Sequence, residues 1–190
     1  AFFACFKIRA VPINVNYRYL DEELFYLLEN ADVEALVFHR SLGNRVARIC
    51  HRLPQLKIMI SVDDGVPEDD SEEPSAAIPY ESLIAKNSGA ARITPEGDEI
   101  YMFYTGGTTG MPKGVLWRQG DFLASPLGGK RADGSVIDSI DEYVAGALKS
   151  KGYRSLPAPP FMHGTGQLIA LAAWTRGDGV VLQNVVEHLD

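Results

Sequence analysis

The sequence predicts an α/β fold in which a parallel sheet is flanked by helices. Two observations support this fold class. Short apolar segments alternate with helical patterns from the start of the chain to Val62, and the connections between them are short. Such alternation is typical of parallel strands with helices packed on the sheet faces. The chain of 190 residues, 46% hydrophobic and 23% charged, is long enough for one domain with a sizeable core.

The first part of the chain is expected to alternate strand and helix. Residues 10–15 favour an extended segment, and Pro12 places it at a sheet edge or at a strand start. Asp21 can cap a helix that ends near Asn30 and carries three leucines at helical spacing. The remaining expected elements are strands at residues 35–38 and 57–62 and a helix at residues 41–53 that Pro54 ends.

An acidic surface loop is expected at about residues 63–74. Its acidic residues, with no basic residue among them, are Asp63, Asp64, Glu68, Asp69, Asp70, Glu72 and Glu73. A solvated, mobile loop accounts for this composition better than a metal site does. The formal net charge of −7 argues against nucleic acid as a partner.

The cysteine content and the hydropathy favour a cytoplasmic protein. Cys5 and Cys50 are too few for a disulfide framework or for a metal site of the CxxC kind. Two thiols in a reducing cytoplasm are the expected state. No apolar run reaches the length of a membrane span, so no transmembrane segment is expected.

The second part of the chain is expected to begin with a connector at residues 74–97, in which residues 80–85 can form a short helical turn. Ser139 and Glu142 have the spacing of a capping box for a helix that ends near Gly152. The other expected features are an apolar return at 115–117, an element opening at 118–121, a surface loop at 125–134, a helix at 167–174, a turn at 176–178 and a strand at 179–183.

The most informative stretch is Tyr101 to Val115, which reads YMFYTGGTTGMPKGV. Its apolar start favours a buried strand, and its glycines let the backbone approach a ligand and point N–H groups into one concavity. Threonine hydroxyls and the charge of Lys113 add groups that attract an anion. The sequence therefore predicts a phosphate-binding loop, although a flexible glycine turn is the simpler alternative. The loop consists of Thr105, Gly106, Gly107, Thr108, Thr109 and Gly110, and Lys113 follows it.

The spacing of this loop separates it from two better-known nucleotide loops. Lys113 is followed by Gly114 rather than by the serine or threonine that a Walker loop needs, which disfavours a P-loop kinase or ATPase. The glycines also lack the GxGxxG spacing of a dinucleotide-binding turn.

The second informative stretch is Leu156 to Gly166, which reads LPAPPFMHGTG. Its three prolines exclude a helix until about Gly164. His163 is therefore expected where the chain enters a helix, a position from which side chains commonly reach a ligand. A lone histidine is often structural or merely exposed, so the residues alone leave its role open.

Three stretches together resemble one family. YTGGTTGMPKGV resembles the phosphate-loop signature of the adenylate-forming, or AMP-binding, superfamily, and every position fits. AVPINVNYRYLDEELFYLLENADVEALVF resembles the segment that precedes this loop in acyl-CoA synthetases, where a strand ends in a Pro-x-Asn turn. PAPPFMHGTG resembles the second core motif of the family. The Val-Leu-Trp-Arg sequence at residues 115–118 is similar to that of bacterial long-chain and sterol-tail acyl-CoA synthetases.

The resemblance implies an ATP-dependent acyl-CoA synthetase. Such an enzyme activates a carboxylic acid, here a long-chain fatty acid or a steroid side-chain acid, as acyl-AMP with release of pyrophosphate. It then forms the coenzyme A thioester. ATP, coenzyme A and Mg²⁺ are the implied ligands. Gly106 to Gly110 and Lys113 would bind the β- and γ-phosphates, Thr105 would lie near the magnesium ion, and His163 would lie near the reacting carboxylate.

The departures from the family pattern limit what this chain is expected to do alone. We find no Tyr-Gly-x-Thr-Glu stretch, whose glutamate would hold magnesium, and no Thr-Gly-Asp stretch, whose aspartate would bind ribose. The small C-terminal domain of the family, with its adenylation lysine, is expected to lie outside these residues. We therefore expect residues 1–190 to be part of the large N-terminal domain, cut at both ends and catalytically inactive alone. The alternatives are a non-catalytic nucleotide-binding remnant or an adenylation domain for another carboxylate.

Overall fold

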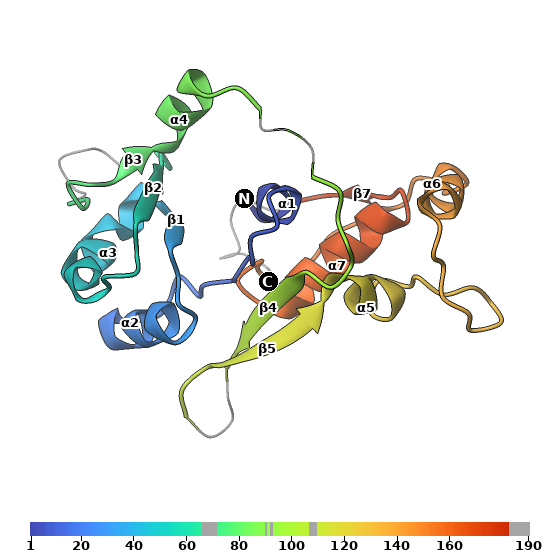
Figure 1. Cartoon of the computed structure of the whole chain (residues 1–190), viewed down its shortest axis with the longest axis horizontal. Coiled ribbons are helices and arrows are strands. Elements are labelled where there is room, and N and C mark those ends of the chain that lie inside the picture. The colour runs from blue at the N-terminus through green and yellow to red at the C-terminus, as the bar shows by residue number, and fades with distance from the viewer. Residues whose placement is uncertain (66–71, 90, 92, 107–109, 183–190) are drawn as a thin grey trace, which may run out of the picture. The chain divides into compact units, whose positions relative to one another are not determined.

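The computed structural model describes residues 1–65, 72–89, 91, 93–106 and 110–182 (Figure 1). The chain divides into two compact units. Most of the first unit is Val15–Ile93, whereas the second contains Cys5–Asn14, Thr94–Gly106 and the chain from Lys113 onward. The short helix α1, Phe2–Lys7, opens the chain.

The first unit is built around a parallel sheet with the strand order β1-β2-β3. The strands are β1 (Ala35–His39), β2 (Ile58–Val62) and β3 (Ile78–Pro79). The register pairs Ala35 with Ile58 and Ile60 with Ile78. The parallel sheet confirms the predicted fold class, and the expected strands at 35–38 and 57–62 are confirmed. Sequence reasoning missed β3 because two residues inside a connector carry no periodic signal.

Three helices accompany this sheet: α2 (Asp21–Asn30), α3 (Gly43–Ile49) and α4 (Tyr80–Lys86). Helix α2 buries Leu24, Leu27 and Leu28 on one stripe, as predicted, and packs against α3. The predicted helix at 41–53 is wrong in extent. It consists of α3 between two 3₁₀ turns, η1 (Arg40–Leu42) and η2 (Cys50–Arg52). The predicted helical turn at 80–85 is α4.

The predicted capping role of Asp21 is wrong, because Asp21 is already the first residue of α2 and Leu20 occupies the cap position. The Leu20 N–H donates instead to the Glu23 carboxylate, at 3.0 Å. Asp21 accepts two hydrogen bonds from the Arg48 guanidinium of α3, at 2.6 and 2.9 Å. The charge of Asp21 thus joins two helices while still lying in the first turn, where a carboxylate is favoured.

The described ends of the acidic segment are attached to the residues that follow β1. The Arg40 Nε lies 2.9 Å from a Glu73 carboxylate oxygen, and the Ser41 N–H donates to Asp64 at 3.3 Å. Residues 66–71, which include Glu68, Asp69 and Asp70, lie outside the described residues. In the described ranges, no three or more histidine, cysteine or acidic side chains are grouped so as to hold a metal ion.

The second unit contains an antiparallel hairpin of β4 (Ile100–Thr105) and β5 (Lys113–Arg118). The predicted buried strand is β4, and the apolar return at 115–117 is the middle of β5. The predicted extended segment at residues 10–15 does not form a strand, since only Ile13 forms a bridge, parallel to Met102. The reason lies in the next residue: the Asn14 side chain, rather than its backbone, bonds the main chain of β4.

Aromatic side chains form the core beside this hairpin. Tyr101 is fully buried, and its ring centroid lies 5.1 Å from that of Phe122 on helix α5 (Gln119–Ala124). Trp117 of β5 lies edge-on to the same Phe122 ring, at 5.6 Å. Helix α7 (Gly164–Thr175) packs against β4 (Figure 1). Edge-to-face aromatic pairs add to the hydrophobic gain and fix how the hairpin and helices meet.

The rest of the second unit comprises α6 (Ile140–Leu148), β6 (Arg154–Ser155) and β7 (Gly179–Val180). Ser139 caps α6 as predicted, accepting from the Glu142 N–H at 3.4 Å. The other half of the predicted capping box is wrong, because the Glu142 carboxylate binds Arg131 at 2.5 Å. The predicted helix at 167–174 is α7. Of the predicted strand at 179–183, Gly179 and Val180 form β7, which pairs in parallel with β6, and Gln183 lies outside the described residues.

The lengths and hydropathies of the helices were also compared with those of membrane spans. Within the described ranges, no helix is both long and apolar enough to cross a membrane.

Candidate functional site

The predicted phosphate loop connects the two strands of the hairpin. Thr105 is the last residue of β4, Lys113 is the first residue of β5, and the antiparallel register pairs the two. Gly107, Thr108 and Thr109 lie outside the described residues. Gly110 has φ +142°, a backbone conformation that side-chain-bearing residues rarely adopt, so glycine suits this position.

A pocket of about 380 Å³ lies beside the start of the loop. It brings Thr105 and Gly106 together with His163, which is more than fifty positions later in the sequence. The other lining residues are mostly apolar: Phe103, Tyr104, Val115, Trp117, Phe122, Pro126, Gly164, Thr165 and Leu168. A mostly apolar concavity with a few convergent polar groups is the usual form of a small-molecule site.

The alternation of the hairpin residues decides which side chains form the pocket wall. Phe103 and Thr105 share one face of β4, because successive side chains point to opposite faces of a strand. Their cross-strand partners are Val115 and Lys113. Lys113 therefore projects from the face that lines the pocket, and it is exposed to solvent, although it is not itself a lining residue.

The amino-terminal end of α7 also lines the pocket. His163 occupies the cap position of this helix, and Gly164 and Thr165 begin it. A Cβ atom on Gly164 would lie 2.9 Å from the Phe103 ring, so glycine allows the helix end to approach β4 closely. First-turn N–H groups lack helical partners, and the helix dipole is positive at this end. Both properties favour a negatively charged ligand in the pocket.

Sequence reasoning did not single out Asn14, a buried residue that bonds segments beside both motifs. Its side chain is buried, with 5% of the residue exposed, and it bonds the backbone at two distant places. Asn14 Oδ1 accepts from the Tyr104 N–H at 2.9 Å, and Nδ2 donates to the Tyr104 and Met162 carbonyls at 3.3 and 2.6 Å. A polar residue inside the apolar run AVPINV was the available signal.

A second buried amide, that of Gln167, holds the segment before His163. Gln167 Nε2 donates to the Phe161 carbonyl, and Gln167 Oε1 accepts from the Tyr101 hydroxyl. Burial raises the pKa of Tyr101, so its hydroxyl remains a protonated donor at neutral pH. The segment that carries His163 is thus bonded to β4 through two side-chain amides.

The predicted magnesium ligand, Thr105, lies at the pocket. Thr105 is exposed at the pocket and offers one hydroxyl oxygen. The part of the chain that the structure describes holds no metal-ligating cluster of histidine, cysteine or acidic residues. Magnesium is commonly held by one or two protein oxygens together with phosphate oxygens and water. Thr105 fits the role of a single ligand of this kind.

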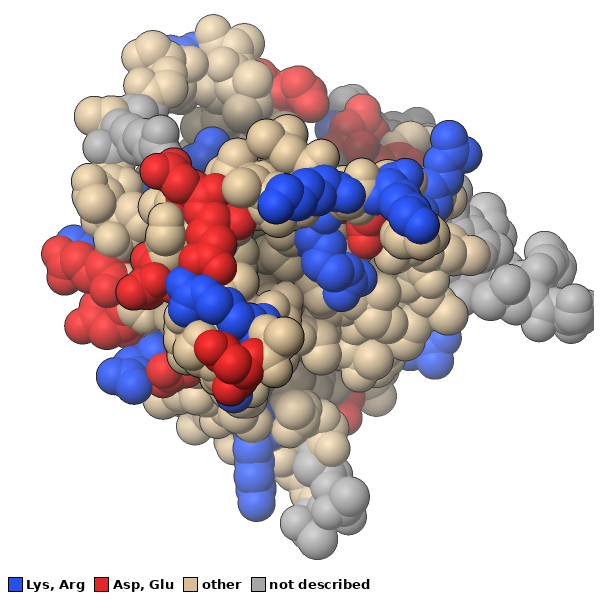
Figure 2. Space-filling model, turned by 90° about the vertical axis from the view of Figure 1, so that its right-hand side faces the viewer, with Lys and Arg blue, Asp and Glu red and all other residues tan. Residues whose placement is uncertain are grey.

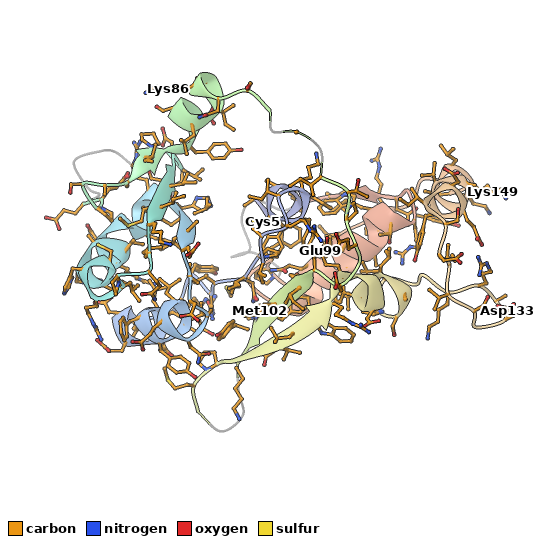
Figure 3. The ribbon with its side chains drawn as sticks, in the orientation of Figure 1. Cys5, Lys86, Glu99, Met102, Asp133 and Lys149 are labelled. Atoms are coloured by element: carbon orange, nitrogen blue, oxygen red, sulfur yellow. The ribbon has the colours of Figure 1, made fainter. Side chains whose placement is uncertain are left out.

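Charged side chains around the second unit are mixed in sign. Glu99, which precedes β4, lies 2.9 Å from Arg9 (Figure 3). Hydrogen bonds from the Glu96 and Gly97 N–H groups, together with Arg9, lower the pKa of Glu99. Both acidic and basic side chains appear on the face shown in Figure 2, so no single charge covers it.

Comparisons with known proteins agree on one family. The model of the family described as AMP-binding enzyme matches residues 1–190. The chain is 41% identical to the medium-chain acyl-CoA ligase Mig of Mycobacterium avium, over 100% of this chain and 34% of the relative. It is 35% identical to the 3-oxocholest-4-en-26-oate–CoA ligase of Rhodococcus rhodochrous, over 96% of this chain and 33% of the relative.

A solved structure shares the fold. The coronafacic acid ligase of Pectobacterium brasiliense superimposes with a TM-score of 0.66 at 17% identity, over 97% of this chain and 33% of that one. The chain therefore spans about a third of the length of the proteins that it matches.

Proposed function

Because the chain belongs to the AMP-binding enzyme family, whose model matches residues 1–190, we propose that the protein is an ATP-dependent acyl-CoA synthetase. It would join a carboxylic acid to AMP with release of pyrophosphate, and then transfer the acyl group to the thiol of coenzyme A. Its small-molecule partners would be the acid, ATP and coenzyme A. The relatives at 41% and 35% identity are both CoA ligases, which supports this choice over a non-catalytic remnant.

The single observation that carries the proposal is the pocket that joins the loop start to His163. Thr105 and Gly106, which begin the predicted phosphate loop, line this pocket together with His163 and the first residues of α7. Acyl-adenylate formation needs the α-phosphate of ATP and a carboxylate within one site. A pocket that is lined by both motifs meets that requirement.

Different residues would bind the phosphates, neutralise the leaving group and lie beside the carboxylate. The loop N–H groups of Gly106 to Gly110 and the threonine hydroxyls would bind the β- and γ-phosphates. The charge of Lys113 would neutralise the negative charge that grows on the leaving pyrophosphate. His163 would lie beside the substrate carboxylate. When Mg²⁺ is bound, Thr105 would supply one ligand, and the ion would offset phosphate charge.

The acid is proposed to have a large apolar part, such as a medium-chain or long-chain fatty acid or a steroid side-chain acid. The side chains of Phe103, Val115, Trp117, Phe122 and Leu168 give the pocket an apolar lining. The two relatives are a medium-chain acyl-CoA ligase and a 3-oxocholest-4-en-26-oate–CoA ligase. The protein is also proposed to be cytoplasmic, since ATP, coenzyme A and reduced thiols occur in the cytoplasm.

The test uses the full-length protein that carries this chain. We expect pyrophosphate release that depends on added carboxylate, AMP as a product, and a thioester only when coenzyme A is present. A panel of acetate, decanoate, palmitate and 3-oxocholest-4-en-26-oate would rank the acids by kcat/KM. If none of these acids supported pyrophosphate release, the proposal would be contradicted. We also propose that residues 1–190 alone do not catalyse this reaction, and the same assay on that piece tests this.

A further inference from the structure

We propose that Asn14 is a positioning residue, which sets the distance between the phosphate loop and His163. The inference rests on the proposed function, because it concerns how the two halves of that site are held together. Asn14 itself does not line the pocket. It would act through the two backbone segments that it bonds.

The first step of the argument is where these bonds fall. Asn14 pairs with both the N–H and the carbonyl of Tyr104, the residue immediately before Thr105. Its amide also donates, at 2.6 Å, to the carbonyl of Met162, the residue immediately before His163. One planar amide therefore fixes the backbone directly before each of the two motifs that meet in the pocket.

The second step is that the bonds are buried. With 5% of Asn14 exposed, water offers little compensation for a lost bond, so a buried partner left unpaired is costly. A side-chain amide is also rigid across its donor and acceptor atoms. Tyr104 and Met162 are therefore held in one relative placement rather than in a range of placements.

The third step is that loss of Asn14 should shift the site without unfolding it. The carbonyl of Phe161 still accepts from Gln167, and the His163 N–H still donates to the Pro160 carbonyl at 2.9 Å. Strand β4 remains paired with β5 along its whole length. The segment that carries His163 would keep these attachments and lose the one that fixes it to the loop start.

Two substitutions separate positioning from a general structural effect. Asn14→Ala removes all three bonds. Asn14→Asp keeps an acceptor for the Tyr104 N–H, but its ionised carboxylate loses both donors and faces two carbonyl oxygens. Burial and those carbonyls would raise the pKa of the introduced carboxyl, and its protonated form regains one donor. The activity of N14D relative to wild type should therefore rise as the pH falls.

The kinetic experiment uses the full-length enzyme and carboxylate-dependent pyrophosphate release. We expect N14A to lower kcat/KM about tenfold to a hundredfold, mostly through kcat, since a misplaced group is felt mainly in the transition state. Asn16→Ala is the matched control, because the Asn16 side chain accepts a local bond from the Arg18 N–H, which lies two positions away. The inference would be overturned if N14A had wild-type kinetics. It would also be overturned if the activity of N14D relative to that of wild type did not change with pH.

A second measurement does not depend on activity. Hydrogen exchange in peptides that cover residues 100–106 and 160–166 should rise together in N14A and stay unchanged in N16A. A rise in only one of the two peptides, or in neither, would show that Asn14 does not couple them. If the wild-type enzyme released no pyrophosphate with any acid, the proposed function would fail, and the exchange result would still decide whether Asn14 joins the two segments.

Discussion

Thr105 and Lys113 face each other across the β4–β5 hairpin, as the last residue of one strand and the first of the other. The pairing places the lysine beside the residue that begins the predicted phosphate loop, on the face of the hairpin that lines the pocket. A loop with a cation at its exit and a pocket at its entry is suited to hold a polyphosphate. Three predictions concern the site, and a fourth concerns stability at low pH.

The first prediction concerns the charge of Lys113. We expect Lys113→Ala in the full-length enzyme to lower kcat for pyrophosphate release by about a hundredfold, because charge on the leaving pyrophosphate loses its counter-charge. Lys149→Ala is the control, since Lys149 is an exposed lysine that follows α6 (Figure 3). An unchanged rate in the Lys113 variant would indicate that the loop is a structural turn without a role in catalysis.

The second prediction concerns His163 at the start of α7. We expect His163→Ala to raise KM for the acid and to lower kcat/KM for it about tenfold, while KM for ATP changes little, because the loop remains intact. His51→Ala is the control, since His51 lies exposed in η2 of the first unit. Equal effects on the KM values for acid and ATP would argue against a place beside the carboxylate.

The third prediction compares two helical glycines. A Cβ atom on Gly166 of α7 would lie 2.3 and 2.7 Å from the carbonyl oxygens of Pro159 and Pro160. Gly166→Ala should therefore destabilise the protein by about 1–3 kcal/mol, because the helix must move away from the proline segment. Gly146 of α6 has no atom within 4 Å of the same position, so Gly146→Ala should stabilise by up to about 1 kcal/mol.

Denaturant unfolding of the full-length protein would measure both glycine changes. The proline segment that Gly166 contacts lies directly before His163. G166A is therefore expected to lower activity as well as stability. If G166A and G146A shifted the unfolding midpoint equally, the tight packing between α7 and the proline segment would be contradicted.

The fourth prediction concerns pH. Hydrogen bonds from Arg48 lower the pKa of Asp21 below its ordinary 3.8, and hydrogen bonds from Arg52 lower the pKa of Glu22 below its ordinary 4.5. A carboxyl whose pKa is lower in the folded state adds stability above its ordinary pKa and loses it as the pH falls through the folded value. Both pairs are exposed at the surface, so each contribution is small and weakened by salt.

Unfolding curves between about pH 5 and pH 3 would check this expectation. The free energy of unfolding should fall with pH, and the fall should be shallower in a variant with Arg48→Ala and Arg52→Ala. If this double variant had the same pH dependence as wild type, the two pairs would not contribute to acid sensitivity.

Local sequence patterns predicted much of the fold. The three leucines of α2, the apolar strands β1 and β2, and the prolines that delay α7 until Gly164 depend on neighbours a few positions apart. The glycine-rich loop and the PPFMHGTG stretch likewise indicated the family from contiguous residues. The misplaced cap at Asp21 shows the limit of local reasoning, because a partner on another helix decided the role of that carboxylate.

The sequence by itself thus determined most of the longer elements, the two motifs and the family, because hydrophobic spacing and turn chemistry act over short stretches of chain. Only the tertiary structure decided that Lys113 shares a face with Thr105, since that depends on the register of the hairpin. Only the tertiary structure also revealed Asn14, whose partner Tyr104 lies 90 positions away. Hydrogen bonds at such separations form when packing brings the segments together, and no local pattern encodes them.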